Sequence, residues 1–250
     1  MKPLFLFLLS ALAVSDTSVT HSTINDNVDI TSSLFISRVS NEALSEFEKK
    51  AREAAVKVVA RNGHGSGSYV KFRGFHLIFT AAHVVDSGSK QFVVMGDGEK
   101  VIGHLVYADK KLDVAVLLIP EMKTRQAVKY RPLKDPADVG TQIIYAGFPA
   151  SHSLLSIRGM VAGHEFDRYG NKVLLLHSYA WFGCSGSGVY DEHGNFVGVL
   201  WGVDAPRKGL IPQIVEDIVW VTPSSSISED KIIAGICKSL LTESRSCAAY

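Results

Sequence analysis

Three glycines and two serines lie close together in the stretch Trp181-Phe182-Gly183-Cys184-Ser185-Gly186-Ser187-Gly188-Val189-Tyr190. A plain turn seldom needs so much conformational freedom, whereas a serine between glycines can occupy a tight, sparsely allowed bend of the backbone. Its hydroxyl is then exposed, and neighbouring backbone N–H groups can face the group that it attacks. The stretch therefore predicts a nucleophilic Ser185, although a glycine- and serine-rich hairpin loop has a similar composition.

A serine hydroxyl is a weak nucleophile, so it needs a base, and the base needs an acid that orients it. His83 follows an expected strand in the block Phe79–Val85, and Asp113 opens the apolar run that ends at Leu118. Taken alone, such a histidine is more often a satisfied core residue and such an aspartate a turn cap. Asp109 is an alternative acid, but Asp113 is favoured because the apolar strand directly follows it.

Short runs typical of β-strands predominate from about residue 54, and Gly, Asp, Asn and Pro separate them. The first set comprises 55–61, 67–72, 76–80, 91–95, 101–108 and 114–119, and the second comprises 141–146, 156–164, 173–177, 188–191, 196–201 and 218–222. A polar, proline-bearing connection separates the sets, and strands do not alternate with helices as in a parallel α/β fold. We expect an all-β fold of two six-stranded antiparallel β-barrels, at about 54–130 and 136–222.

Two helices are expected at the ends of this folded region, which should span residues 41–241. A short N-terminal helix is predicted over 41–51, with Asn41 as its N-cap. A C-terminal helix is predicted over 226–241, where Ser226 and Glu229 fit a capping box and an apolar stripe follows. We expect this second helix to pack against the second barrel, and residues 242–250 to form a tail.

The N-terminus resembles an export signal. A short basic start precedes an apolar run from Leu4 to Val14, which is too short to cross a bilayer comfortably. We expect residues 1–15 to be a signal peptide, with cleavage after Ala13 or Ser15 fitting equally well, and residues 16–40 to be a flexible linker. The expected location is secreted or periplasmic, and an uncleaved membrane anchor is the alternative.

Composition narrows the possible partners. The net charge is +1 and no basic run is present, so neither nucleic acid nor a membrane, beyond targeting, is an expected partner. No Cys/His spacing matches a zinc site, so we expect neither metal nor cofactor. Pairing of Cys237 with Cys247 would leave Cys184 as a free thiol. The oligomeric state is not indicated.

Three blocks of the chain resemble those of the chymotrypsin-like (trypsin-fold) serine proteases. Thr80–His83 matches the T-A-A-H block of that family, Asp113–Leu117 matches D-x-A-x-L, and Gly183–Ser187 matches G-x-S-G-G except at its last position. Further agreement lies in Gly65–Val70, Val199–Gly202 and Trp220–Pro223. The motif style is closest to bacterial and viral HtrA-like members, here without a PDZ domain because few residues follow Pro223.

This resemblance implies a double barrel and a serine endopeptidase acting on protein or peptide substrates. It implies that Ser185 attacks the peptide carbonyl, that His83 is the general base and then the general acid, and that Asp113 orients His83. The backbone N–H groups of Gly183 and Ser185 would form the oxyanion hole.

The same resemblance places substrate-binding residues. Tyr179 would lie at the floor of the specificity pocket, and Trp201 and Gly202 would bind an extended substrate through their backbone. Because Tyr179 is not acidic, we expect an uncharged P1 residue rather than Arg or Lys.

Two residues depart from expectation or compete for a role. Ser187 replaces the usual last glycine and is expected to narrow the pocket. Cys184 would be the nucleophile in viral cysteine members of the fold, but its register relative to Gly183 favours Ser185.

An α/β-hydrolase is excluded by both motif and residue order. A catalytically inactive binding module and a viral polyprotein-processing protease remain as alternatives.

Overall fold

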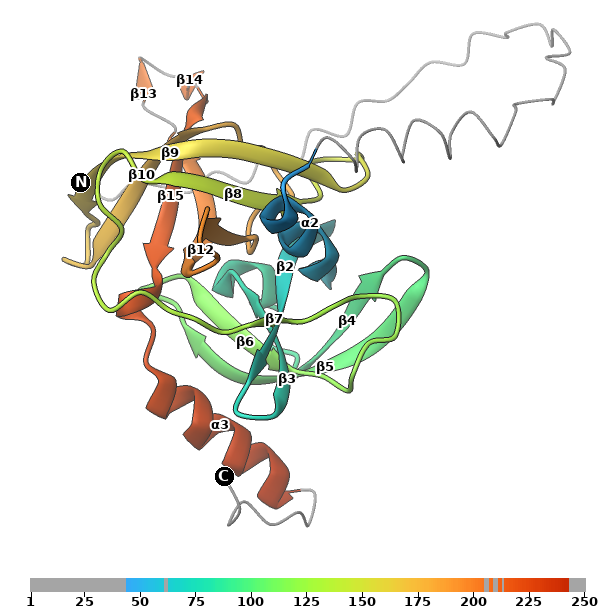
Figure 1. Cartoon of the computed structure of the whole chain (residues 1–250). Helices are drawn as coiled ribbons and strands as arrows, with labels where there is room; N and C mark the ends of the chain where they lie inside the picture. Colours follow the sequence, from blue (N-terminus) through green and yellow to red (C-terminus); the bar gives the residue numbers. More distant parts are fainter. Residues whose placement is uncertain (1–43, 61–62, 205–206, 209–210, 213, 243–250) are drawn as a thin grey trace, which may run out of the picture. The chain divides into compact units, whose positions relative to one another are not determined.

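Two closed β-barrels make up most of the protein, as a computed structural model shows (Figure 1). The structure describes residues 44–60, 63–204, 207–208, 211–212 and 214–242. Both barrels belong to one unit of the chain, residues 41–250. The predicted signal peptide, the linker and residues 243–250 of the predicted tail lie outside the described residues and remain predictions, whereas Thr242 ends the C-terminal helix and is not part of a tail.

The first barrel is a ring of six antiparallel strands in the hydrogen-bonded order β1-β4-β5-β6-β3-β2, closed by the pairing of β1 with β2. Its strands are β1 (Ala55–Ala60), β2 (Gly63–Phe72), β3 (Phe75–Thr80), β4 (Gln91–Gly96), β5 (Glu99–Asp109) and β6 (Val114–Leu118). A short strand that we did not predict, β7 (Val128–Lys129), extends β2 in parallel.

The second barrel closes in the order β10-β15-β12-β11-β8-β9. Its strands are β8 (Gln142–Gly147), β9 (Leu155–Phe166), β10 (Lys172–Ser178), β11 (Gly188–Asp191), β12 (Phe196–Asp204) and β15 (Val215–Pro223). A separate two-stranded sheet, β13 (Arg207–Lys208) with β14 (Ile211–Pro212), was also not predicted. The predicted all-β double barrel is confirmed, and each expected strand has its counterpart.

Aromatic side chains join the two barrels. The ring of Phe79 from β3 stacks on Tyr130 with centroids 5.0 Å apart, and it contacts Phe196 from β12 at 5.2 Å. Phe79 and Phe196 are fully buried, and Tyr130 comes from the connection between the barrels. Burial of such large rings is among the strongest sources of packing energy. This contact sets the two barrels against each other next to the loops that carry the predicted site.

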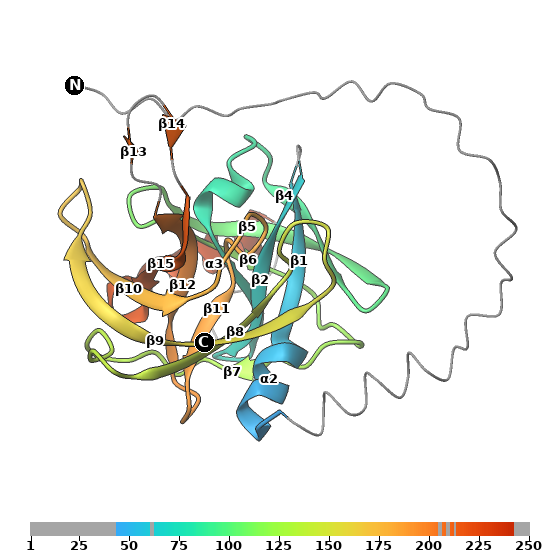
Figure 2. The ribbon, with the colours of Figure 1, turned by 90° about the horizontal axis from the view of Figure 1, so that it is seen from above.

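Helix α2 (Glu46–Ala54) runs directly into β1. It begins later than predicted, because Ser45 and Glu48 form a capping box and so start the helix at Glu46. Asn41, the predicted N-cap, lies outside the described residues. The helix lies against β2 and β7 of the first barrel and also against β8 and β9 of the second (Figure 2).

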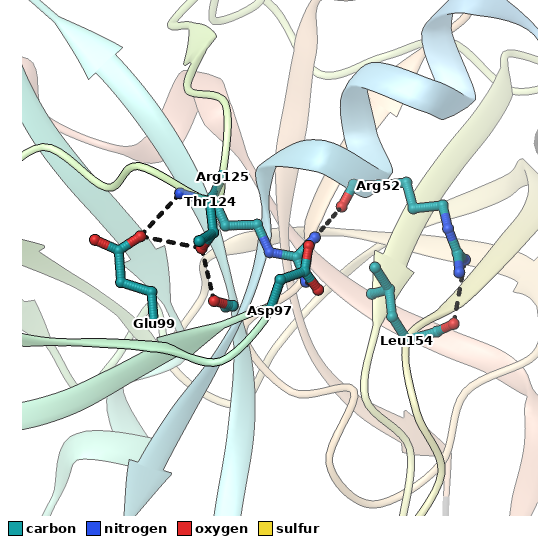
Figure 3. A network of polar contacts seen from close by, with 7 residues as sticks. Arg52, Asp97, Glu99, Thr124, Arg125 and Leu154 are labelled. Atoms are coloured by element: carbon teal, nitrogen blue, oxygen red, sulfur yellow. Dashed lines mark hydrogen bonds and ion pairs between the residues drawn. The ribbon is translucent and has the colours of Figure 1, made fainter. Parts of the chain in front are cut away.

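Charged side chains tie α2 to both barrels. Arg125 donates from its guanidinium to Asp97 at 2.8 Å and to the Arg52 carbonyl at 3.1 Å, and Arg52 donates to the Leu154 carbonyl at 3.1 Å (Figure 3). Glu48, which is 2% exposed, pairs with Arg158 of β9 at 2.5 Å. The helix therefore acts as a strap across the two barrels.

Helix α3 (Glu229–Thr242) follows a single 3₁₀ turn, η2 (Ser224–Ser226), so the helix starts three residues later than predicted. Ser228, rather than Ser226, accepts a backbone hydrogen bond near the helix start, from Lys231 N–H. The predicted docking was wrong: α3 packs on β5 of the first barrel, not on the second barrel (Figure 1).

Close approach explains where α3 docks. A Cβ on Gly235 would lie 1.9 Å from the Val106 carbonyl oxygen of β5, so only glycine lets the helix lie this near the strand. Ile232 and Ile236 are fully buried there, and Cys237 of the same helix is disulfide-bonded. Cys247, the partner that we expected, lies outside the described residues. Among the described residues, no helix is long and apolar enough to cross a membrane.

Candidate active site

His83 and Asp113 lie side by side in the first barrel. His83 belongs to the 3₁₀ turn η1 (Ala82–Val85) after β3, and Asp113 directly precedes β6 with a left-handed φ of 54°. Asp113 Oδ2 is 2.7 Å from the ring nitrogen Nδ1 of His83, and Oδ1 accepts the backbone N–H of His83 at 2.8 Å. One carboxylate thus fixes both the ring and its backbone. With Nδ1 donating to Asp113, Nε2 is the nitrogen left to accept a proton.

The second barrel holds the loop that carries Asp113. The Leu112 carbonyl accepts a hydrogen bond of 2.5 Å from Thr222 Oγ1 of β15, and the Lys111 carbonyl accepts one of 3.1 Å from Asn171 Nδ2 in the β9–β10 turn. Thr222 is 1% exposed. Side chains of the second barrel thus anchor the two residues before Asp113. These contacts help to hold its left-handed backbone conformation.

Asp109, the alternative acid, has another task. Its Oδ1 accepts the backbone N–H groups of Lys111 and Leu112 at 2.9 and 3.1 Å. This is the turn-capping role that short acidic side chains often fill. Within the described residues, Asp113 and not Asp109 bonds to His83.

Ser185 lies in the turn between β10 and β11, in the second barrel. The turn packs against the block that leads to His83, since a Cβ on Gly186 would lie 2.3 Å from Thr80 Oγ1 and 3.0 Å from the Ala81 nitrogen. The Ser185 hydroxyl donates to the Trp201 carbonyl at 3.3 Å. Among the described residues no hydrogen bond joins Ser185 to His83.

Two backbone N–H groups of this turn, those of Gly183 and Ser185, have no hydrogen-bond acceptor within the described residues. The carbonyls of Phe182 and Cys184 accept hydrogen bonds from Ala150 and Ser187, at 2.6 and 3.0 Å. In a trans peptide the N–H points away from the preceding carbonyl, so the N–H groups of Gly183 and Ser185 point away from these contacts. Neither has an acceptor in the described part of the chain, and such paired donors suit an oxyanion.

Cys184 is fully buried within the second barrel. Burial raises the pKa of its thiol, and the Tyr145 hydroxyl lies beside it. A thiol that stays protonated and has no access to solvent is a poor nucleophile. These observations favour a packing role for Cys184.

Ser187 is also fully buried, and its hydroxyl has no hydrogen-bond partner within the described residues. A Cβ on Gly147, at the end of β8, would lie 2.4 Å from Ser187 Oγ. The side chain therefore fills the space that a glycine leaves open at residue 147. We expected Ser187 to narrow the substrate pocket, whereas the structure shows its hydroxyl against Gly147.

The predicted substrate-binding residues come from the start of the Ser185 turn, directly after β10, and from β12. Tyr179 is 43% exposed, and its carbonyl accepts a hydrogen bond from the Tyr145 hydroxyl. Trp201 lies at an irregularity in the pairing of β12 with β15, with its ring 5.5 Å from that of Trp220. Gly202 would have open space around a side chain. Trp201 and Gly202 are both half-buried.

Sequence reasoning gave no role to Ser66 or Thr222, although both lie in the blocks that carried the resemblance. Ser66 bonds to the Ser185 turn, and Thr222 bonds to the loop of Asp113. Alternation of glycine and serine in Gly65–Ser68 signals a close approach of strands. It does not say what approaches.

No group of three or more His, Cys, Asp or Glu residues in the described ranges is arranged to hold a metal ion.

The family of trypsin-like peptidase domains matches the chain over residues 65–199. A probable periplasmic serine endoprotease, DegP-like, of Rhizobium meliloti is 27% identical over 154 residues, which are 59% of the chain and 29% of that relative. The protein of the same name from Brucella suis is 24% identical over 172 residues, 66% of the chain and 31% of that relative. The chain thus spans less than a third of the length of these relatives.

Solved structures share the fold. The Rv3671c protease from M. tuberculosis, in its active form, has a TM-score of 0.58 at 19% identity, over 77% of the chain and 83% of that structure. The serine endoprotease from Yersinia pestis has a TM-score of 0.56 at 20% identity, over 80% of the chain and 66% of that structure. The family match covers more than half of the 250 residues of the chain. The chain therefore belongs to the family of trypsin-like peptidase domains.

Proposed function

We propose that the chain is a serine endopeptidase that hydrolyses peptide bonds in protein or peptide substrates. Ser185 is the nucleophile, His83 the general base and then the general acid, and Asp113 the group that orients His83. The N–H groups of Gly183 and Ser185 bind the oxygen on which negative charge develops.

The proposed reaction has two halves. In the first, Ser185 Oγ bonds to the substrate carbonyl carbon, its proton passes to Nε2 of His83, and the carbonyl electron pair moves onto oxygen. The C–N bond then breaks, and His83 gives the proton to the leaving amine. In the second half, water replaces the amine and releases the acyl group from Ser185 by the same route.

The observation that supports this proposal most strongly is the double hydrogen bond between Asp113 and His83, at 2.7 and 2.8 Å. Both distances are those of charge-assisted hydrogen bonds. The arrangement holds the imidazole in the tautomer that can accept a proton at Nε2. It also lies beside the turn that presents Ser185 and two unpaired N–H groups.

A binding module without catalysis is the second candidate, and one observation favours it. The Ser185 hydroxyl bonds to the Trp201 carbonyl, and among the described residues no hydrogen bond joins it to His83. Catalytic hydrogen bonds often form only when substrate is present. The peptidase therefore remains the first candidate, and the experiment below separates the two.

The proposed substrate preference is for an uncharged P1 residue, with Tyr179 at the pocket and the backbone of Trp201 and Gly202 pairing with an extended substrate. Tyr179 carries no charge to attract a basic side chain, and its ring is partly accessible. Digestion of a peptide library is the test. Cleavage mainly after Arg or Lys would overturn this preference.

The proposed location is secreted or periplasmic, directed by a signal peptide over residues 1–15. Two relatives are described as periplasmic serine endoproteases, which supports the proposal. N-terminal sequencing of the protein exported from cells tests it, and a first residue of Met1 would contradict it.

Digestion of casein by purified wild type, Ser185→Ala and Cys184→Ala tests the proposed function. We expect wild type and Cys184→Ala to cut casein, and Ser185→Ala to be at least about 10⁴-fold slower. Mass spectrometry of the products locates the cut bonds. No cleavage by wild type favours the binding module, and loss of activity only in Cys184→Ala favours the thiol.

A further inference from the structure

Ser66 is a fully buried residue of β2, and its N–H, carbonyl and hydroxyl are all hydrogen-bonded. Its N–H donates to the Ser185 carbonyl at 2.8 Å, and its carbonyl accepts from Thr80 Oγ1 at 2.8 Å. Its hydroxyl donates to the Gly183 carbonyl at 2.7 Å and accepts the Phe148 N–H at 2.9 Å. One side chain from the first barrel therefore contacts two separate segments of the second.

The second of these segments is the turn that follows β8. His64 Nε2 lies 2.9 Å from the Phe148 carbonyl, so β2 holds Phe148 on both its N–H and its C=O side. Two residues later, the Ala150 N–H donates to the Phe182 carbonyl at 2.6 Å. Ala150 itself has a left-handed φ of 47°, a conformation that costs energy in a residue other than glycine.

These contacts fix the peptide groups on both sides of Gly183. The carbonyl before it, of Phe182, is held by Ala150, and its own carbonyl is held by Ser66. Glycine at a φ of 99° has several other accessible conformations, so the N–H of Gly183 keeps its direction only if its neighbours are fixed. The Ser66 hydroxyl does this directly through Gly183 and indirectly through Phe148.

We propose that Ser66 is a positioning residue for the oxyanion hole, because its hydroxyl fixes the peptide groups that direct the Gly183 N–H. The inference rests on the proposed peptidase function and adds a residue from the other barrel to its machinery. Ser66 touches no reacting atom in this account. Its effect passes through the backbone of Gly183.

Ser68 provides a matched control. It lies two residues further along β2, so its side chain is on the same face of the strand. It is 2% exposed, and its hydroxyl is also hydrogen-bonded to the second barrel, there to the Tyr190 hydroxyl of β11. Ser68→Ala therefore removes a buried hydroxyl and a contact between barrels, and it leaves the hydrogen bonds of Ser66 to Gly183 and Phe148 in place.

The experiment compares wild type, Ser66→Ala, Ser68→Ala and Ser185→Ala on one peptide substrate, with folding checked by circular dichroism. We expect Ser66→Ala to lower kcat about tenfold or more with KM nearly unchanged, which is less than the roughly 10²- to 10³-fold loss from removing an oxyanion donor outright. We expect Ser68→Ala to keep kcat within about twofold, since it disturbs only stability.

A readout specific to the oxyanion hole distinguishes positioning from general damage. A peptide aldehyde forms a tetrahedral adduct with the serine, and we expect its inhibition constant to rise by the same factor as kcat falls in Ser66→Ala. The carbonyl stretch of a slowly hydrolysed acyl-enzyme should shift to higher frequency, because the carbonyl is less polarised. Equal values in Ser66→Ala and Ser68→Ala would overturn the inference.

Two further outcomes are interpretable. If Ser66→Ala does not fold, Ser66→Cys keeps the size of the side chain and replaces the hydroxyl by a thiol, which is only a weak donor, and unchanged kcat and aldehyde binding there overturn the inference. If Ser185→Ala is as active as wild type, the proposed function itself fails. If Ser185→Ala is inactive while Ser66→Ala has the kcat and the aldehyde inhibition constant of wild type, only the role of Ser66 is overturned.

Discussion

The loop of Asp113 and the turn of Ser185 are each held by the opposite barrel, but by different means. Thr222 and Asn171 of the second barrel hold the Asp113 loop through its backbone carbonyls and leave the carboxylate to bond His83. Ser66 of the first barrel holds the Ser185 turn through both its N–H and its hydroxyl. The first arrangement presents a side chain, and the second presents backbone N–H groups.

This difference indicates that the two barrels depend on each other for different parts of the proposed site. Damage to the Asp113 loop should act through the orientation of His83. Damage around the Ser185 turn should act through the oxyanion hole. A substitution that loosens the barrels away from both loops should change stability alone.

The largest effect is expected from Asp113→Asn, which should lower kcat about 10⁴-fold. An amide keeps the shape of the loop but no longer holds His83 in the productive tautomer. The measurement is kcat and KM on a peptide that wild type cleaves. Asp109→Asn is the matched control: it caps the adjacent turn, and we expect its kcat to stay within about threefold of wild type. Equal losses in both variants would remove the distinction between the two aspartates.

An intermediate effect is expected from Thr222→Val, which keeps the shape of a buried side chain and removes its hydrogen bond to Leu112. We expect a fall in kcat of about tenfold, corresponding to the net energy of one hydrogen bond. In the Asp113→Asn background the same change should have little further effect, because both act through His83. Additive losses would show that Thr222 does not act through Asp113. Thr124→Val, in a hydrogen-bonded turn of the first barrel, serves as the control.

The smallest effect on catalysis is expected from Glu48→Gln, in the strap formed by α2. The hydrogen bond from Arg158, above all, lowers the pKa of Glu48 from 4.5 to about 2. Because the folded pKa is below the unfolded one, this stabilisation is complete above about pH 4.5 and is lost as the pH falls towards 2.

Urea unfolding at several pH values measures this contribution. We expect Glu48→Gln to lower the free energy of unfolding by on the order of 2 kcal/mol at pH 7. This value is reduced because Arg158 is largely exposed to solvent. We expect the kcat of the variant to equal that of wild type. Its stability should then change less than that of wild type between pH 4.5 and 2. A large fall in kcat would mean that the strap also positions one of the two loops.

The strands were predictable because each barrel buries one face of every strand. In β1, for example, Val56 and Val58 are fully buried and Lys57 between them is not, and this alternation is visible in the sequence. The apolar stripe of α3 was equally visible. It showed that one face of the helix is buried, but not that Gly235 would let the helix approach the first barrel.

The site was predictable only in part, because some of its residues act through contacts that arise only when the barrels pack together. The chemistry of serine catalysis directs attention to Ser185, His83 and Asp113, and the structure shows the hydrogen bonds between the last two. Ser66 and Thr222 act through backbone atoms of distant segments, so no residue type announces them. Contacts of this kind depend on how the barrels pack, which is a property of the fold and not of a motif.

The central claim is that Ser185 is a nucleophile activated by His83. Labelling with a fluorophosphonate probe, followed by mass spectrometric mapping of the adduct, tests it most directly. The account predicts one adduct per chain on Ser185 in wild type, and none in Ser185→Ala or, within the labelling time of wild type, in His83→Ala. No adduct in folded wild type, or an adduct on another residue, would contradict it.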